Sequence, residues 1–273
     1  MQVLERIIPY KRSDVFPLYL VGDIHCGTIH CAEDEIRSKV QEIKSNPQAL
    51  WLGMGDYAEW ITPFDKRWDP SQKAVASWLE QDNIAECQRK WIKKLFEPIR
   101  KQCIGLLYGN HEESIRHCNH DNVLKNVCDD LELENLGYSC FVDFIFRREG
   151  SKEAHQIRGA FTHGTGNART DSGKVNYLAR FMSDFDAQLY GYAHTHTIYM
   201  LTPTNLGIDK RDTIEGYSKI GALTGCFFRT YTQGVVASYG EQKVYKPTRI
   251  GCPKFNIYPD DGEVGIEIKV KLW

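Results

Sequence analysis

Short apolar runs and longer amphipathic stretches alternate along the first half of the chain. The apolar runs are Phe16–Val21, Ala49–Leu52 and Cys103–Tyr108. Continuous runs of this kind are typical of strands that are buried on both faces. The stretches with apolar residues at helical spacing are Cys31–Ser45, Lys73–Arg100 and Asp121–Leu133, with Gly137 as the predicted cap of the last. The pattern therefore predicts strands that alternate with helices.

The second half is richer in strand patterns. The predicted strands are Ser139–Phe146, Ile157–Phe161, Ala187–Tyr190, Ile198–Leu201, Tyr217–Tyr231 and Val264–Leu272. Ser172–Ser183 is predicted to be a helix between them. This order predicts an α/β fold in which two sheets pack together with helices outside. No repeat or long linker interrupts the chain, so we expect one domain over residues 1–273, with residues 205–273 completing the second sheet and lining a cleft.

Polar residues with metal-binding side chains follow several of these predicted strands. They lie in Gly22-Asp23-Ile24-His25, Gly55-Asp56, Gly109-Asn110-His111-Glu112, Thr162-His163-Gly164 and Gly191-Tyr192-Ala193-His194-Thr195-His196. Functional residues of open α/β sheets gather at the carboxyl ends of strands. Asp23 and His25 are two positions apart, so an extended backbone would point both side chains the same way, and His194 and His196 repeat this spacing.

Each segment alone is weak evidence, because an isolated Asp-x-His or His-x-His pair is usually an ordinary surface or core pair. The complete series is far more specific, since every segment follows a strand-like run. The Asp56 carboxylate has two oxygens and could bridge two cations. Oxygen and imidazole ligands together suit manganese, iron, zinc or nickel, and we expect manganese first.

The series resembles the pattern D-x-H, G-D, G-N-H-[DE], H and G-H-x-H of the calcineurin-like metallophosphoesterase superfamily, over about residues 17–200. In the last segment, Ala193 stands where that pattern has glycine directly before the histidine. The resemblance implies two mixed sheets flanked by helices, a four-layer sandwich that binds two divalent metal ions. One ion would be bound by Asp23, His25, Asp56 and His196, and the other by Asp56, Asn110, His163 and His194. It also implies that His111 is the general acid.

These expectations favour a phosphoester hydrolase. Our first choice is a phosphodiesterase that acts on DNA, RNA or a nucleotide. A phosphomonoesterase and a non-catalytic scaffold remain the alternatives. Protein phosphatases of the superfamily carry an arginine shortly after the bridging aspartate, and Gly55-Asp56-Tyr57-Ala58-Glu59-Trp60 has none. Residues 223–253 resemble a subgroup encoded by phages and prophages. Aromatic and basic residues interleave over Arg229–Pro253, a composition that could stack bases and bind a phosphate backbone.

Composition says more about the cellular compartment than about the substrate. The net charge of −2 shows no basic footprint for nucleic acid. No apolar run approaches the roughly 18 residues of a membrane span, and the first residues lack the apolar core of a secretory signal. No cysteine pair has the C-x-x-C spacing of a zinc ribbon, and we expect reduced thiols in a cytoplasmic protein. The sequence leaves the oligomeric state open.

Overall fold

The computed structural model describes residues 1–65, 67–68, 71, 73–208, 210–261 and 263–267. A five-stranded mixed sheet has the order β13-β12-β2-β3-β4. Its strands are β2 (Phe16–Val21), β3 (Leu50–Gly53), β4 (Cys103–Leu106), β12 (Lys254–Tyr258) and β13 (Glu263–Glu267). The three strands β2, β3 and β4 are parallel, so their carboxyl ends meet at one edge of this sheet.

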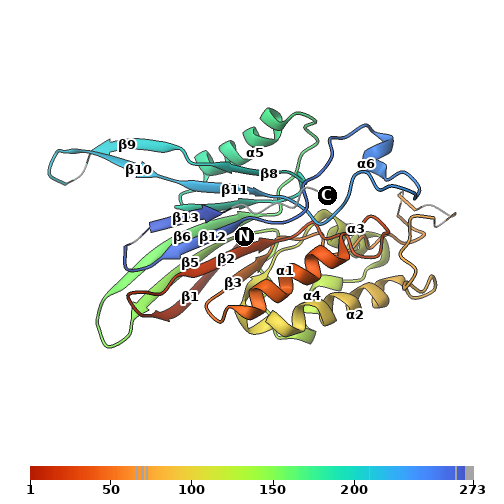
Figure 1. The fold of residues 1–273 in the computed structure, drawn as a ribbon, viewed down its shortest axis with the longest axis horizontal. Helices are drawn as coiled ribbons and strands as arrows, with labels where there is room; N and C mark the ends of the chain where they lie inside the picture. The colour runs from red at the N-terminus through yellow and green to blue at the C-terminus, as the bar shows by residue number, and fades with distance from the viewer. Residues whose placement is uncertain (66, 69–70, 72, 209, 262, 268–273) are drawn as a thin grey trace.

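A six-stranded mixed sheet has the order β1-β5-β6-β7-β11-β8. Its strands are β1 (Gln2–Tyr10), β5 (Ser139–Arg148), β6 (Ala154–Thr162), β7 (Leu189–Tyr192), β8 (Ile198–Leu201) and β11 (Ile220–Thr224). Strands β9 (Thr204–Ile208) and β10 (Ile214–Ser218) form a separate ribbon that projects from the body of the molecule (Figure 1).

Helices cover the outer faces of the two sheets (Figure 1). The helices of the described residues are α1 (Glu33–Ser45), α2 (Ile84–Phe96), the 3-10 helix η1 (Glu97–Gln102), α3 (Asn110–Asn119), α4 (Val123–Leu131), α5 (Asp171–Asp184) and the short α6 (Tyr239–Gln242). Helices α1, α2 and α4 pack on the five-stranded sheet, and α5 packs on the six-stranded sheet. The predicted fold class, two packed mixed sheets flanked by helices, is confirmed.

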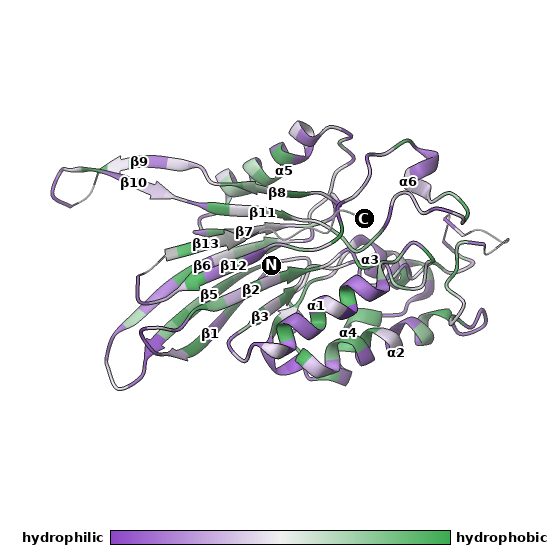
Figure 2. Ribbon diagram, in the orientation of Figure 1, coloured by the Kyte–Doolittle hydropathy of each residue, from purple (hydrophilic) through white to green (hydrophobic). Residues whose placement is uncertain are grey.

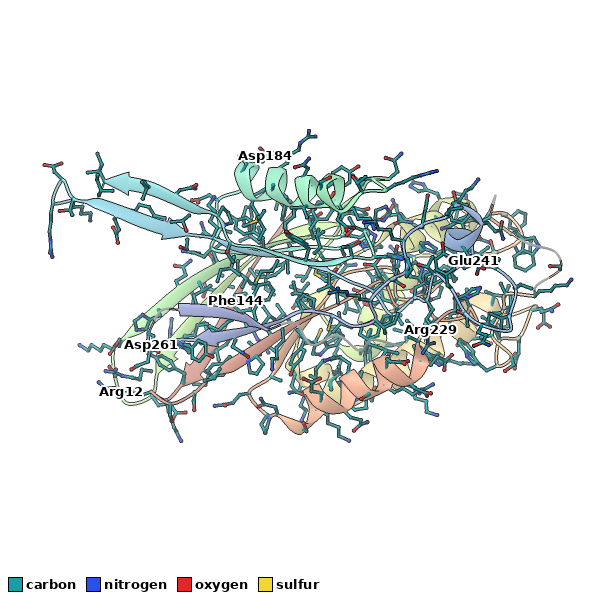
Figure 3. The ribbon with its side chains drawn as sticks, turned by 45° about the horizontal axis from the view of Figure 1, so that its top comes forward. Arg12, Phe144, Asp184, Arg229, Glu241 and Asp261 are labelled. Carbon is teal, nitrogen blue, oxygen red and sulfur yellow. The ribbon has the colours of Figure 1, made fainter. Side chains whose placement is uncertain are left out.

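Strand β2 shows how the apolar runs create these layers. Tyr19 and Val21 point toward the helices, whereas Leu18 and Leu20 point into the core between the sheets. A strand alternates its side chains between two faces, so a run that is apolar at every position serves both cores. Figure 2 shows hydrophobic residues on the strands of both sheets and on the helices, and Phe144 of β5, labelled in Figure 3, belongs to the core between the sheets.

The predicted helix over Lys73–Arg100 is wrong in its first part, because α2 begins only at Ile84. The preceding segment is held by backbone hydrogen bonds to the loop after β2: Ile29 N–H donates to Ala74 O, and Ala76 N–H donates to Gly27 O. The apolar residues of this segment therefore pack from a loop and do not form the face of a helix.

Other predicted boundaries also change. Helix α4 ends at Leu131, and its cap is Glu132, with a φ of 56°, rather than the predicted Gly137. The predicted strand over Tyr217–Tyr231 is divided, since β10 ends at Ser218 and β11 ends where Gly225 turns at a φ of 74°. The end of the predicted Val264–Leu272 strand lies outside the described residues. No described helix is long and apolar enough to cross a membrane.

Candidate metal centre

The loops that follow the strands bring the predicted site residues together. Asp23, His25, Asp56, His194 and His196 all have φ values between 48° and 65°. Non-glycine residues rarely adopt this left-handed conformation, which costs about 1–3 kcal/mol each and clusters at functional sites. The extended geometry expected for Asp23 with His25, and for His194 with His196, is therefore wrong. Strands β2 and β7 end at Val21 and Tyr192, and tight turns present these side chains instead.

One group of side chains consists of Asp23, His25 and His196. The Nε2 atoms of His25 and His196 lie 3.0 Å apart. Asp23 Oδ1 lies 3.2 Å from His196 Nε2 and 3.9 Å from His25 Nε2. The other carboxylate oxygen, Asp23 Oδ2, accepts the backbone N–H of His194. Asp23 is thus fixed through one oxygen and presents the other to the two imidazoles.

A second group consists of Asp56, His163 and His194. Asp56 Oδ2 lies 3.3 Å from His163 Nε2, and Asn110 Oδ1 lies 3.1 Å from the same nitrogen. The rings of His163 and His194 have centroids 5.3 Å apart. Asn110 is the first residue of α3, so the structure places its amide at the start of a helix directly after β4.

Asp56 links the two groups. Its Oδ1 accepts the backbone N–H of His111, which fixes the carboxylate. Its Oδ2 lies 3.3 Å from His163 Nε2 in one group and 4.0 Å from His25 Nε2 in the other. The side chain that was expected to bridge two cations therefore has one oxygen between both sets of donor atoms.

Hydrogen bonds on the far side of the imidazole rings set their orientation. His163 Nδ1 lies 2.7 Å from Met54 O, and His194 Nε2 lies 3.2 Å from Gly166 O. Because a carbonyl only accepts, the nitrogen beside it carries the proton and the opposite nitrogen keeps its lone pair. His25 Nδ1 lies 3.1 Å from Glu59 Oε1, an arrangement that orients histidines toward metals.

The donor atoms that face the centre fit divalent cations. Among the described residues, Asp23 Oδ1 and His194 Nδ1 are buried without a hydrogen-bond partner. Buried polar atoms normally have partners, so these atoms are suited to a ligand. The donors are oxygen and imidazole nitrogen, which suit manganese, iron, zinc or nickel. Cys26 is beside the centre in sequence, but burial raises the pKa of its thiol and keeps it protonated.

The carboxylates around the centre are ionised at neutral pH. Burial alone would raise the pKa of Asp23 and Asp56, but the neighbouring histidines outweigh burial and hold both below the usual range. Burial likewise opposes ionisation of Glu59, yet His111 and His25 lower its pKa to about 2. The concentration of negative charge among buried side chains favours binding of cations.

Glu112 holds the turn that carries Asp56. It is fully buried, and its carboxylate accepts the backbone N–H groups of Asp56, Tyr57 and Gly109 together with the indole N–H of Trp60. These four bonds connect the turn after β3 to the start of α3. Glu112 therefore positions the backbone of Asp56 rather than an imidazole.

His111 lies beside the first group, with its ring centroid 4.7 Å from that of His25. His111 Nδ1 lies 2.7 Å from the backbone oxygen of Glu59, so this nitrogen donates, and Nε2 lies 2.8 Å from Arg67 NH1. Burial lowers the pKa of His111 to about 4, although Asp56 and Glu59 raise it. The imidazole is therefore neutral at neutral pH, and its Nε2 is an acceptor.

Sequence reasoning missed two charged residues at the centre. Glu59 approaches both His25 and His111. In the sequence, its position three residues after the proposed ligand Asp56 could have pointed to this role. Arg67 comes from a loop with no recognisable motif, and nothing in its sequence context indicates that it reaches His111.

The centre also requires glycine at position 109. A Cβ on Gly109 would lie 2.1 Å from Asp56 Oδ1, so a larger residue would displace the carboxylate that links the two groups.

Comparisons with known proteins give a likeness of overall structure only. No protein-family model and no curated protein sequence matches the chain. A metallophosphoesterase from Sphaerobacter thermophilus is 13% identical with a TM-score of 0.39, over 93% of this chain and 89% of that one. Vps29 from Chaetomium thermophilum is 10% identical with a TM-score of 0.38, over 94% and 95%.

Vps29 from Entamoeba histolytica, in a complex with Zn²⁺, is 9% identical with a TM-score of 0.32, over 93% of this chain and 98% of that one. At these identities and TM-scores, the likeness carries no argument about what this chain does. The geometry of its own buried histidines and carboxylates has to supply that argument.

Proposed function

We propose that this chain is a hydrolase of phosphate esters that uses two adjacent divalent cations. The single observation that carries the proposal is the position of Asp56 Oδ2, which lies between two sets of buried nitrogen and oxygen donors. A shared carboxylate oxygen is suited to holding two cations a few ångströms apart, and such pairs are typical of phosphoester hydrolysis.

The proposed ligands are those expected from the sequence. One cation would be held by Asp23, His25, Asp56 and His196, and the other by Asp56, Asn110, His163 and His194. Manganese is our first choice of metal, with iron, zinc or nickel as the alternatives. When bound, the cations supply Lewis-acid activation of the phosphoryl group and of the attacking water.

His111 is proposed to donate a proton to the leaving group from Nε2, because its Nδ1–H is already donated to Glu59 O. The neutral imidazole takes that proton from solvent once substrate is bound and passes it to the leaving alkoxide. An anionic phosphate close to the ring favours its protonated form, which supports this order of events. The Glu59 carboxylate, whose Oε2 lies 3.8 Å from His111 Nδ1, favours the same form.

The test compares bis-p-nitrophenyl phosphate, p-nitrophenyl phosphate, cyclic nucleotides and DNA as substrates of the manganese-loaded protein. We expect hydrolysis that stops when the metal is removed. His111→Gln should lower the rate roughly 10²–10⁴-fold for substrates with poor leaving groups, and less for p-nitrophenyl esters. An inactive wild-type protein that retains both metals would favour the non-catalytic scaffold instead.

We extend the proposal to a diester that contains a nucleotide, and the contacts of residues 229–253 support this choice. The preceding residue, Phe228, packs on His25 and His196 with ring centroids 5.3 and 5.8 Å apart. Tyr245 lies under the guanidinium of Arg169, in the loop whose Gly166 contacts His194. Figure 3 shows Arg229 and Glu241 at the end of the molecule opposite Arg12 and Asp261.

The tyrosines of this segment provide the test of the nucleotide. Replacing Tyr239 and Tyr245 with alanine should raise KM for a nucleotide diester and leave turnover of bis-p-nitrophenyl phosphate unchanged. Equal effects on both substrates would mean that the segment only supports the fold. This segment also belongs to residues 223–253, which resemble the subgroup encoded by phages and prophages. A phosphomonoesterase remains the second candidate and is separated from the first by the substrate panel.

A further inference from the structure

We propose that Arg67 binds the phosphoryl group of the substrate and so supplies the arginine that the segment after Asp56 lacks. This inference rests on the proposed function, since it assigns a residue to the same site. A guanidinium matches the oxygens of a phosphate with planar, charge-assisted hydrogen bonds. Arg67 lies 11 positions after Asp56, outside every segment that supplies a proposed ligand.

The guanidinium of Arg67 is held in a fixed orientation by Asp65. Its Nε lies 3.0 Å from Asp65 Oδ1 and its NH2 lies 2.7 Å from Asp65 Oδ2, a two-point contact. Asp65 Oδ2 also accepts the hydroxyl of Ser114, at 2.7 Å. Because Ser114 belongs to α3, the pair is anchored to the helix that begins with Asn110 and His111.

A second contact docks the same loop on the same helix. The Thr62 hydroxyl lies 2.8 Å from Asn119 Oδ1, at the end of α3. Thr62 and Asp65 therefore contact α3 at successive positions, and Arg67 reaches the end of the helix where the metal-binding side chains gather. An arginine oriented in this way loses less conformational freedom when it binds a ligand than a mobile surface arginine does.

The free part of the guanidinium faces the reaction site. NH1 lies 2.8 Å from His111 Nε2 and 3.3 Å from His111 Nδ1, so it packs against the imidazole, and His111 groups with His25 and Asp56 around the centre. Among the described residues, Asp65 and His111 take up three of the five N–H groups that an arginine offers. The remaining N–H groups are available to a phosphate, and the Arg67 side chain is 30% exposed, so a ligand can reach it.

The contact with His111 suggests how substrate changes this arrangement. In the structure, NH1 lies against the nitrogen that is proposed to protonate the leaving group. An anionic phosphate oxygen is a stronger acceptor than an imidazole nitrogen, so the N–H of Arg67 turns to the phosphate when substrate binds. His111 Nε2 is then released to meet the leaving group. Arg67 thereby couples phosphate binding to the freeing of His111.

The experiment measures inorganic phosphate binding to the metal-loaded protein by calorimetry, and the inhibition constant of phosphate in the hydrolysis assay. The variants are Arg67→Ala and Arg67→Lys. The matched control is Arg158→Ala, since Arg158 makes the same two-point contact with Asp143, at 2.7 and 2.9 Å, on the outer part of β6. Metal content is determined for each variant by elemental analysis.

We expect Arg67→Ala to bind phosphate roughly 10- to 100-fold more weakly, as the loss of a charge-assisted hydrogen bond predicts. Arg67→Lys should recover part of this loss, because it keeps the charge without the planar fork. Metal content should stay at the wild-type level in both variants, and Arg158→Ala should resemble the wild type in every measurement.

Unchanged phosphate binding in Arg67→Ala would overturn the inference and show that the arginine only anchors its loop to α3. Loss of metal in that variant would also overturn it, because the effect would then be on the shape of the centre. If the wild type binds metal and phosphate but hydrolyses no ester, the proposed function fails while the binding comparison still decides the role of Arg67.

Discussion

Replacing Glu112 with glutamine tests whether this carboxylate holds the metal centre together. The two residues have the same shape, but each carboxylate oxygen accepts two N–H groups. Oε1 binds Tyr57 N and Trp60 Nε1, and Oε2 binds Asp56 N and Gly109 N, all at 2.8–2.9 Å. The amide group of glutamine would set an NH2 against one of these pairs and leave two buried donors without an acceptor.

The magnitude follows from these lost bonds. Each buried donor without an acceptor costs about 1–3 kcal/mol, or about 2–6 kcal/mol for the pair. Burial and the neighbouring Asp56 raise the pKa of Glu112, so removal of its charge returns part of this cost. We expect a net loss of about 2–4 kcal/mol in the free energy of unfolding. At this chain length, that corresponds to a fall in Tm of about 4–8 °C.

The assay is urea unfolding of the metal-free protein, followed by tryptophan fluorescence, since bound metal would add its own stability. The matched control is Glu113→Gln. Glu113 is the next residue of α3 and pairs with Arg116 at the surface, where ion pairs contribute about 0–1 kcal/mol. If Glu112→Gln proves as stable as Glu113→Gln, the four hydrogen bonds do not organise the turn and the reasoning is refuted.

Two further variants examine the surroundings of the centre. Glu59→Gln should weaken metal binding roughly 10–100-fold in a chelator competition, because Glu59 orients His25, and an unchanged affinity would remove Glu59 from that role. Gly109→Ala should displace Asp56 and cost about 1–3 kcal/mol together with metal, as measured by unfolding and elemental analysis. Its control is Gly216→Ala, where an added Cβ meets nothing closer than 3.5 Å, and equal behaviour of the two variants would contradict the close approach.

The hydrophobic pattern predicts the central layers well because burial on both faces leaves a strong signal. Strand β2 and helix α5 lie close to their predicted positions for this reason. The pattern fails where apolar residues pack irregularly. Trp78 lies at helical spacing with its neighbours, yet its indole donates to Glu33 of α1 from a loop. Strand β1 was missed because it is an edge strand with mostly exposed side chains.

The candidate site was predictable in its residues but not in its geometry. The types and order of the metal-binding side chains were visible in the sequence. The left-handed turns at Asp23 and His194 were not, because Asp and His seldom adopt that conformation and only the surrounding contacts impose it. Arg67 could not be predicted either, since its position depends on how Asp65 contacts Ser114 across the fold.

Metal stoichiometry of matched variants tests the central claim most directly. Elemental analysis of the wild type, after loading with manganese and removal of free metal, should find two cations per chain. Asp56→Ala should lose both because the bridge is removed, and His163→Ala should lose one. His117→Ala, which changes an exposed histidine of α3, should keep both. Two cations retained in folded Asp56→Ala protein would contradict the shared centre.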